Sequence, residues 1–128
     1  MGNPISENIK TGTIGELLVQ TRLLQYGVQA APPLKDTGND LIAVRGESFR
    51  GVQVKTTARG NLQWNNLPEH YHILALVVLA GEDENIFLDA SSVYLVPRAD
   101  VVNVRNNDGS LDRYTICQGL VDQIFNNE

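Results

Sequence analysis

The segment from residue 37 to residue 57 constrains the fold most, because it predicts two strands joined by a short turn. Residues 39–45 and 50–57 are rich in branched apolar side chains, and residues 46–48 have the composition of a turn. Side chains alternate between the faces of a strand, and a slip of one residue moves each of them to the other face. The pairing register of this hairpin therefore decides which polar groups lie together.

Three polar residues of the hairpin are expected on one face. Gln53 and Lys55 point one way, while Val52 and Val54 point the other. Asp40 joins the first pair if the numbers of paired residues add up to an odd total, roughly 93 to 97 for a turn of this length. We expect that register, with the Asp40 and Lys55 side-chain heads within about 6 Å, the range in which opposite charges perturb each other.

A helix is predicted over about residues 6–26 from the helical spacing of its apolar residues. Gly27 is a suitable left-handed terminator. Gly12 and Gly15 lie inside this helix, although each costs about 1 kcal/mol relative to Ala. Glycines in such places usually allow another backbone or a ligand to approach closely.

Glu16 follows the second of these glycines and has two interpretations. It is either an exposed partner of Gln20 or Arg22, or a carboxylate aimed at the hairpin. We expect the helix to pack over the face that carries Asp40, with Glu16 pointing toward that residue.

The rest of the chain predicts further strands and a short terminal helix. Residues 72–80 are almost continuously apolar, as in a strand buried on both faces. The remaining expectations are an edge segment (28–31), a polar connection (58–69), strands (86–90, 93–96), a hairpin (101–105 and 111–116) and a helix (120–125). This order predicts one domain over residues 1–128, an α/β fold with helices around a mixed sheet.

Composition fits a chain that needs no covalent support. At 128 residues and 42% hydrophobic content, the chain can bury about two thirds of its unfolded surface. Cys117 is the single cysteine and is expected to fill space in the core. Because we find neither a signal peptide nor an apolar run near the ~18 residues of a membrane span, we expect a cytoplasmic protein without membrane contact.

The net charge of −5 argues against nucleic acid as a partner, but the charge is unevenly distributed. Residues 1–60 hold seven basic and five acidic side chains, whereas residues 61–128 hold three and ten. The first half, which carries the polar group, is therefore the half that can face a polyanion, unless it is an ordinary solvated surface. The candidate DNA-contacting residues are Lys10, Arg22, Lys35, Arg45, Arg50 and Arg59.

Three motifs in this order resemble the PD-(D/E)xK nuclease superfamily: Gly-Glu-x-x-Val (residues 15–19), Gly-x-Asp (38–40) and Gln-x-Lys (53–55). The chain is most similar to small members such as archaeal Holliday junction resolvases and compact homing endonucleases. Tyr-Leu-Val-Pro (94–97) also resembles small bacterial members. The resemblance spans about residues 8–97 and implies a restriction-endonuclease-like fold.

The resemblance also implies a metal-dependent DNA endonuclease that hydrolyses phosphodiester bonds. Asp40 would be the central metal ligand, Gln53 would replace the family's second acidic ligand, and Glu16 would reach the metal through water. Together with Lys55, the family's lysine, these residues form the expected catalytic set. Mg²⁺, or Mn²⁺ in its place, prefers oxygen ligands and needs only one or two carboxylates.

Two alternatives stay open at this point. His70 and His72 could place two imidazoles on one strand face, but no third zinc ligand is evident. The second alternative is a catalytically inactive module of the same fold that binds nucleic acid or protein. A chain with one site cuts two strands most simply as a symmetric assembly, so we expect a homo-oligomer, either a dimer or a tetramer.

Overall fold

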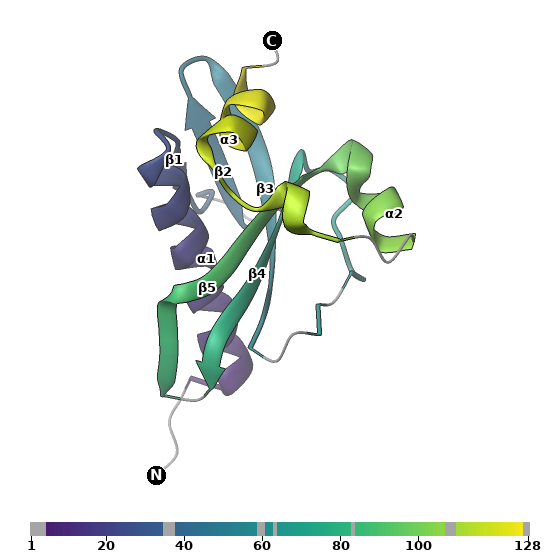
Figure 1. Cartoon of the computed structure of the whole chain (residues 1–128). Helices are drawn as coiled ribbons and strands as arrows, with labels where there is room; N and C mark the ends of the chain where they lie inside the picture. The colour runs from purple at the N-terminus through teal and green to yellow at the C-terminus, as the bar shows by residue number, and fades with distance from the viewer. Residues whose placement is uncertain are drawn as a thin grey trace.

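The computed structural model describes residues 5–34, 38–58, 61–62, 64–82, 84–106 and 110–126. In chain order, its elements are α1 (Glu7–Gln25), β1 (Gln29–Ala31), β2 (Leu41–Arg45), β3 (Ser48–Thr57), β4 (Ile73–Glu82), β5 (Asn85–Pro97), α2 (Arg98–Asn106), the 3-10 turn η1 (Asp112–Tyr114) and α3 (Gln118–Phe125). Figure 1 shows one sheet with helices on both sides.

The sheet is mixed and has the strand order β1-β2-β3-β4-β5. β1, β2 and β3 pair antiparallel, β3 and β4 pair parallel, and β4 and β5 form a long antiparallel hairpin. The prediction of an α/β domain with a mixed central sheet flanked by helices is confirmed. None of the helices in the described ranges is long and apolar enough to cross a membrane.

The register of the β2–β3 hairpin agrees with the expectation from the sequence. Leu41 pairs with Val52 and Arg45 pairs with Ser48, so the paired numbers add up to 93. Gly46 occupies the turn with a φ of +60°, a conformation that suits glycine. The odd total is confirmed.

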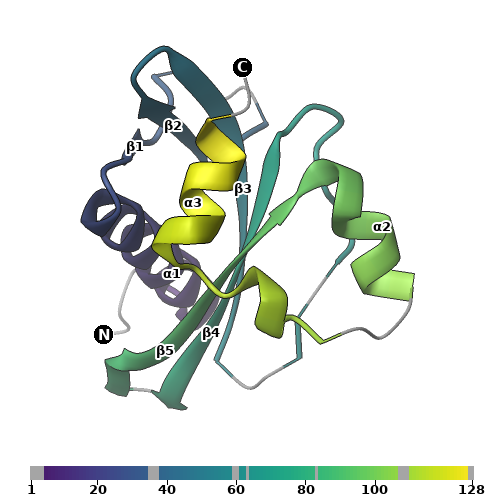
Figure 2. The same cartoon turned by 45° about the horizontal axis from the view of Figure 1, so that its top comes forward.

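The larger core lies on the sheet face that carries Val52 and Val54. Buried residues of α1 and α3, among them Val19 and Phe125, pack there. Gln53 and Lys55 are on the other face, next to a second core under α2 and η1. Figure 2 shows α1 and α2 on opposite sides of the sheet.

The expectation that α1 covers the face of Gln53 and Lys55 is therefore wrong. Gln53 and Lys55 are two polar neighbours on that face, whereas Val52 and Val54 offer a continuous apolar surface. Burying the apolar stripe of a helix requires such a surface.

Residues 101–105 do not form the expected strand, because they belong to α2. Val101 and Val104 are buried and three positions apart, while Val102 between them is 53% exposed, which is a helical pattern. The valines had suggested a strand through their β-branched side chains. Residues 111–116 contain η1 in place of a strand, and the expected turn at 107–109 lies outside the described residues.

Two further expectations are corrected. Residues 86–90 and 93–96 belong to one strand, β5, which pairs with β4 on both sides of a register shift. At this shift, the Ser91 hydroxyl accepts from the Ala80 N–H and donates to the Phe87 carbonyl. Cys117 is exposed and caps α3, with its Sγ accepting from the Leu120 N–H.

Candidate functional site

Asp40 is held at the edge of β3, immediately before β2 begins. Its N–H donates to the Val52 carbonyl at 3.1 Å, and its Oδ2 accepts the Val54 N–H at 2.8 Å. A strand N–H lies close to the plane of its sheet, so this carboxylate occupies the position that β2 leaves open. Asp40 therefore lies beside Val54, the β3 residue between Gln53 and Lys55.

Gln53 brings an unsatisfied oxygen to the same place. The residue is only 9% exposed, and its side-chain Oε1 is buried without a hydrogen-bond partner in the described part of the chain. A buried polar atom in this state costs free energy, and most such atoms in native structures have a partner. The Gln53 Oε1 atom is thus available to a ligand.

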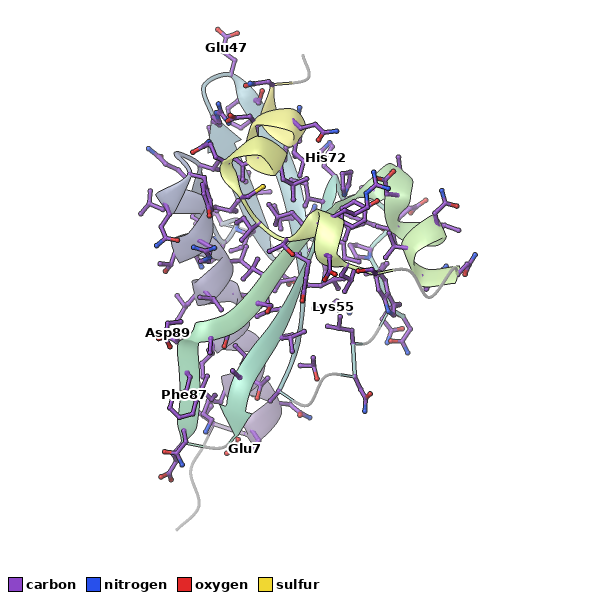
Figure 3. The ribbon with its side chains drawn as sticks, in the orientation of Figure 1. Glu7, Glu47, Lys55, His72, Phe87 and Asp89 are labelled. Carbon is purple, nitrogen blue, oxygen red and sulfur yellow. The ribbon has the colours of Figure 1, made fainter. Side chains whose placement is uncertain are left out.

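Lys55 shares a face with Gln53, because these residues pair with Leu76 and Leu74 of β4. It is half-buried, and within the described ranges it forms no ion pair. Figure 3 shows Lys55 lower along the sheet than His72, beyond η1. The expected separation of about 6 Å between the Asp40 and Lys55 heads stays a prediction.

Glu16 reaches this region from the opposite face. Partial burial raises the pKa of its carboxyl above the usual 4.5, and the nearby negative charge of Asp40 raises this pKa further. The two carboxyl groups are therefore close enough to repel each other. The preceding Gly15 is buried against Thr56 of β3, so tightly that an added Cβ would lie 1.8 Å from the Thr56 Oγ1.

Asn39 is a structural residue of the site that the sequence analysis did not single out. Its Oδ1 is buried without a hydrogen-bond partner among the described residues. Its side chain packs against Gly51, where an added Cβ would come within 2.9 Å. A glycine inside a strand often marks such a close approach, so Gly51 was the available signal.

The candidate metal-binding residues offer only hard oxygen donors. Asp40 and Glu16 supply carboxylates, and Gln53 supplies an amide oxygen, which suits Mg²⁺ or Mn²⁺ better than Zn²⁺. Across the described residues, no three His, Cys, Asp or Glu side chains are grouped as a metal cluster. His72 uses its Nδ1 to accept the Gly51 N–H at 2.9 Å, which leaves the zinc alternative without support.

The four candidate DNA-contacting residues in the described ranges have different neighbours. Lys10 pairs with Glu7 at 3.4 Å, and Arg45 pairs with Asp122 at 2.6 Å. Arg22 stacks on Tyr26, the residue that follows its helix, and Arg50 lines a cavity near the start of β4. Lys35 and Arg59 lie outside the described residues.

The chain folds as a single α/β domain with a mixed five-stranded sheet. Among solved structures, the chain is similar to the bacterial homing endonuclease I-Ssp6803I, with a TM-score of 0.64 and 18% sequence identity. The match covers 98% of this chain and 96% of that chain, and at this identity it shows a shared fold. No protein-family model and no curated protein matches the sequence.

Proposed function

We propose that this protein is a metal-dependent endodeoxyribonuclease of the PD-(D/E)xK type, which hydrolyses phosphodiester bonds in DNA. The observation that carries the proposal is the position of Asp40, whose carboxylate is held at the Val54 N–H between Gln53 and Lys55. The shared fold with a bacterial homing endonuclease over nearly the whole chain supports it.

We infer that Asp40 and Gln53 hold Mg²⁺ or Mn²⁺, with Glu16 joining through water. Two observations support the fit: the Gln53 Oε1 lacks a partner in the described chain, and partial burial, followed by the charge of Asp40, raises the pKa of Glu16. A divalent cation between these groups would take the Gln53 Oε1 as a ligand and would reduce the repulsion between the Glu16 and Asp40 carboxylates. When bound, such a cation acidifies a water molecule and offsets negative charge on the scissile phosphate.

Lys55 is the charge-stabilising residue of the proposal. Its Nζ can donate to a phosphate oxygen or hold the attacking water in line. Asp40 keeps a fixed orientation during these steps, because the Val54 N–H holds one of its oxygens.

The amide at Gln53 has a consequence for the metal. It supplies an oxygen without a negative charge, so the two carboxylates provide the anionic part of the site. We therefore expect weak metal binding that depends on Glu16 more than it would beside a second acidic strand ligand. A homo-oligomer, either a dimer or a tetramer, and a cytoplasmic location stay predictions from the sequence.

Thermal unfolding with metal, combined with cleavage assays, tests this proposal. Millimolar Mn²⁺ should raise the melting temperature, because binding at 100 times Kd stabilises by about 2.7 kcal/mol. Asp40→Asn should abolish both this rise and the Mn²⁺-dependent cleavage of supercoiled, linear, single-stranded or branched DNA. Asp89→Asn is the matched control, since Asp89 is an exposed carboxylate on β5, far from Lys55 (Figure 3).

If wild-type protein shows neither a metal-dependent rise nor cleavage, the nuclease proposal fails. The catalytically inactive module that binds nucleic acid or protein would then be favoured, and the neutral Gln53 would be its first explanation. A metal-dependent rise that survives in Asp40→Asn would place the metal elsewhere and contradict the proposed site.

A further inference from the structure

A second site lies where β3 and β4 begin, between α3 on one side and α2 with η1 on the other. A cavity of about 650 Å³ opens there, and Figure 3 shows His72 in this gap between α3 and α2. The volume falls within the range of roughly 300–1,000 Å³ that is typical of small-molecule sites. The cavity is lined by none of the residues in the proposed catalytic set.

The charge of this cavity is positive. Arg50, Arg98 and Arg113 line it, and they come from three separate parts of the chain. Among the described residues that line the cavity, Asp100 is the one carboxylate, and it already accepts a hydrogen bond from the Tyr114 hydroxyl at 3.0 Å. Three guanidinium groups around one engaged carboxylate favour an anion, and phosphate matches the fork geometry of arginine.

His72 adds a ring N–H donor to the lining. Its Nδ1 accepts the Gly51 N–H, so in the neutral ring the proton must be on Nε2. The Nε2–H is then a donor for an oxygen of the bound anion. The backbone bond at Nδ1 also fixes the ring orientation.

Aromatic and apolar side chains complete the cavity. Arg98 stacks on Tyr71 at 5.1 Å, and Arg113 stacks on Tyr114 at 5.2 Å, which orients both guanidinium groups in advance. The two tyrosines are only 8% and 6% exposed. Further apolar lining comes from Ile73, Leu120 and Ile124. A free phosphate would leave most of this apolar space unfilled. A phosphate attached to a flat, partly apolar group would contact the arginines and also fill the apolar space.

We propose that this cavity binds a nucleoside phosphate. The phosphate contacts Arg50, Arg98, Arg113 and the His72 Nε2–H, and the base lies over the apolar residues. The unit comes either from a free nucleotide or from a strand of nucleic acid that the protein holds. The proposal goes beyond the nuclease function and does not depend on metal binding or cleavage.

Isothermal titration with deoxyadenosine 5′-monophosphate tests the cavity directly, with deoxyadenosine and inorganic phosphate as the two partial ligands. We expect the nucleotide to bind more tightly than either part. Arg98→Gln and Arg113→Gln should each weaken its binding roughly ten- to a hundred-fold, because each removes a charge-assisted hydrogen bond. Arg105→Gln is the matched control, since Arg105 is also on α2 but does not line the cavity.

The Asp40→Asn protein separates this proposal from the nuclease proposal, since it should keep full nucleotide affinity while losing metal-dependent cleavage. A short 5′-phosphorylated single-stranded oligonucleotide identifies the source: tighter binding than the mononucleotide indicates a strand, and weaker binding indicates a free nucleotide. Three results would overturn the proposal: no nucleotide binding at millimolar concentration, affinity unchanged in both arginine variants, or inorganic phosphate binding as tightly as the nucleotide. Circular dichroism of each variant confirms its folding, so that a lost affinity reports on the cavity.

Discussion

At the scale of single residues, the Glu16–Asp40 pair is the feature with the clearest energetic consequence. The ionised form of Glu16 is disfavoured in the folded protein, first by partial burial and then by the charge of Asp40. An acid whose folded pKa exceeds its unfolded pKa stabilises the fold below the unfolded value, here 4.5, and loses this contribution as pH rises through the folded pKa. Without metal, stability should therefore decline across that window.

Glu16→Gln should remove this decline. We expect its melting temperature at pH 7 without metal to exceed that of the wild type by about 1 to 3 °C, a small value because solvent screens a half-exposed carboxyl. Melting curves from pH 4 to pH 8 measure the effect. The control is Glu47→Gln, which removes an exposed carboxylate at the β2–β3 turn (Figure 3) and should keep the wild-type slope. Identical slopes in Glu16→Gln and the wild type would show that the two carboxyl groups do not interact.

At the scale of elements, the contact between α1 and β3 positions the carboxylate from the helix. Gly15 lies directly against Thr56, and Glu16 is the next residue of α1. Any change that moves α1 away from β3 therefore also moves Glu16 relative to Asp40. Gly12 lies in the same helix but has no side-chain or strand atom within 4 Å of its added Cβ.

The two glycines predict substitutions of opposite sign. Gly15→Ala should destabilise by about 1–3 kcal/mol through overpacking, partly offset by the better helix propensity of Ala. Gly12→Ala should stabilise by up to about 1 kcal/mol, because it gains propensity without a clash. Urea unfolding of both variants measures the difference. Thr56→Ala should recover part of the loss in the Gly15→Ala protein, and equal stabilities of the two glycine variants would contradict this packing.

At the scale of the whole molecule, the structure mixes the basic and acidic halves of the chain. Residues 61–128 hold three basic residues, and two of them, Arg98 and Arg113, meet Arg50 of the first half at one cavity. The proposed nucleotide site would add these two arginines to the polyanion contacts expected from residues 1–60. By contrast, Arg45 is engaged by Asp122 at 2.6 Å.

DNA affinity should fall as salt rises, because each neutralised phosphate releases counterions. The measurement uses the Asp40→Asn protein with Ca²⁺, so that binding is observed without cleavage. Arg50→Ala should reduce the slope of log K against log salt by about 1, the value for one phosphate contact. Arg45→Ala should change the slope less, since Asp122 already offsets its charge. Affinity that is absent at low salt, or equal slopes for wild-type and Arg50→Ala proteins, would count against DNA contact through Arg50.

Features that depend on neighbouring residues could be predicted from the order of the amino acids. The β2–β3 register follows from the turn at Gly46 and from strict alternation along two short strands, so the positions of Gln53 and Lys55 on one face could be predicted. α1 was predictable from the helical spacing of its apolar residues and from Gly27, which ends it with a φ of +86°. In the structure, the Ser6 hydroxyl also caps it by accepting the Ile9 N–H. These signals act within a few residues.

Features that depend on which surfaces pack together became visible only in the folded chain. The valines of α2 suit either a strand or a helix in isolation, and burial of Val101 and Val104 against the sheet selected the helix. α1 packs on the sheet face where β3 and β4 present apolar side chains. Glu16 therefore approaches Asp40 from the side opposite to the one expected. Arg50, Arg98 and Arg113 are far apart in the sequence, and chain topology alone brings them to one cavity, because charge spacing along a chain carries no information about distance across a sheet.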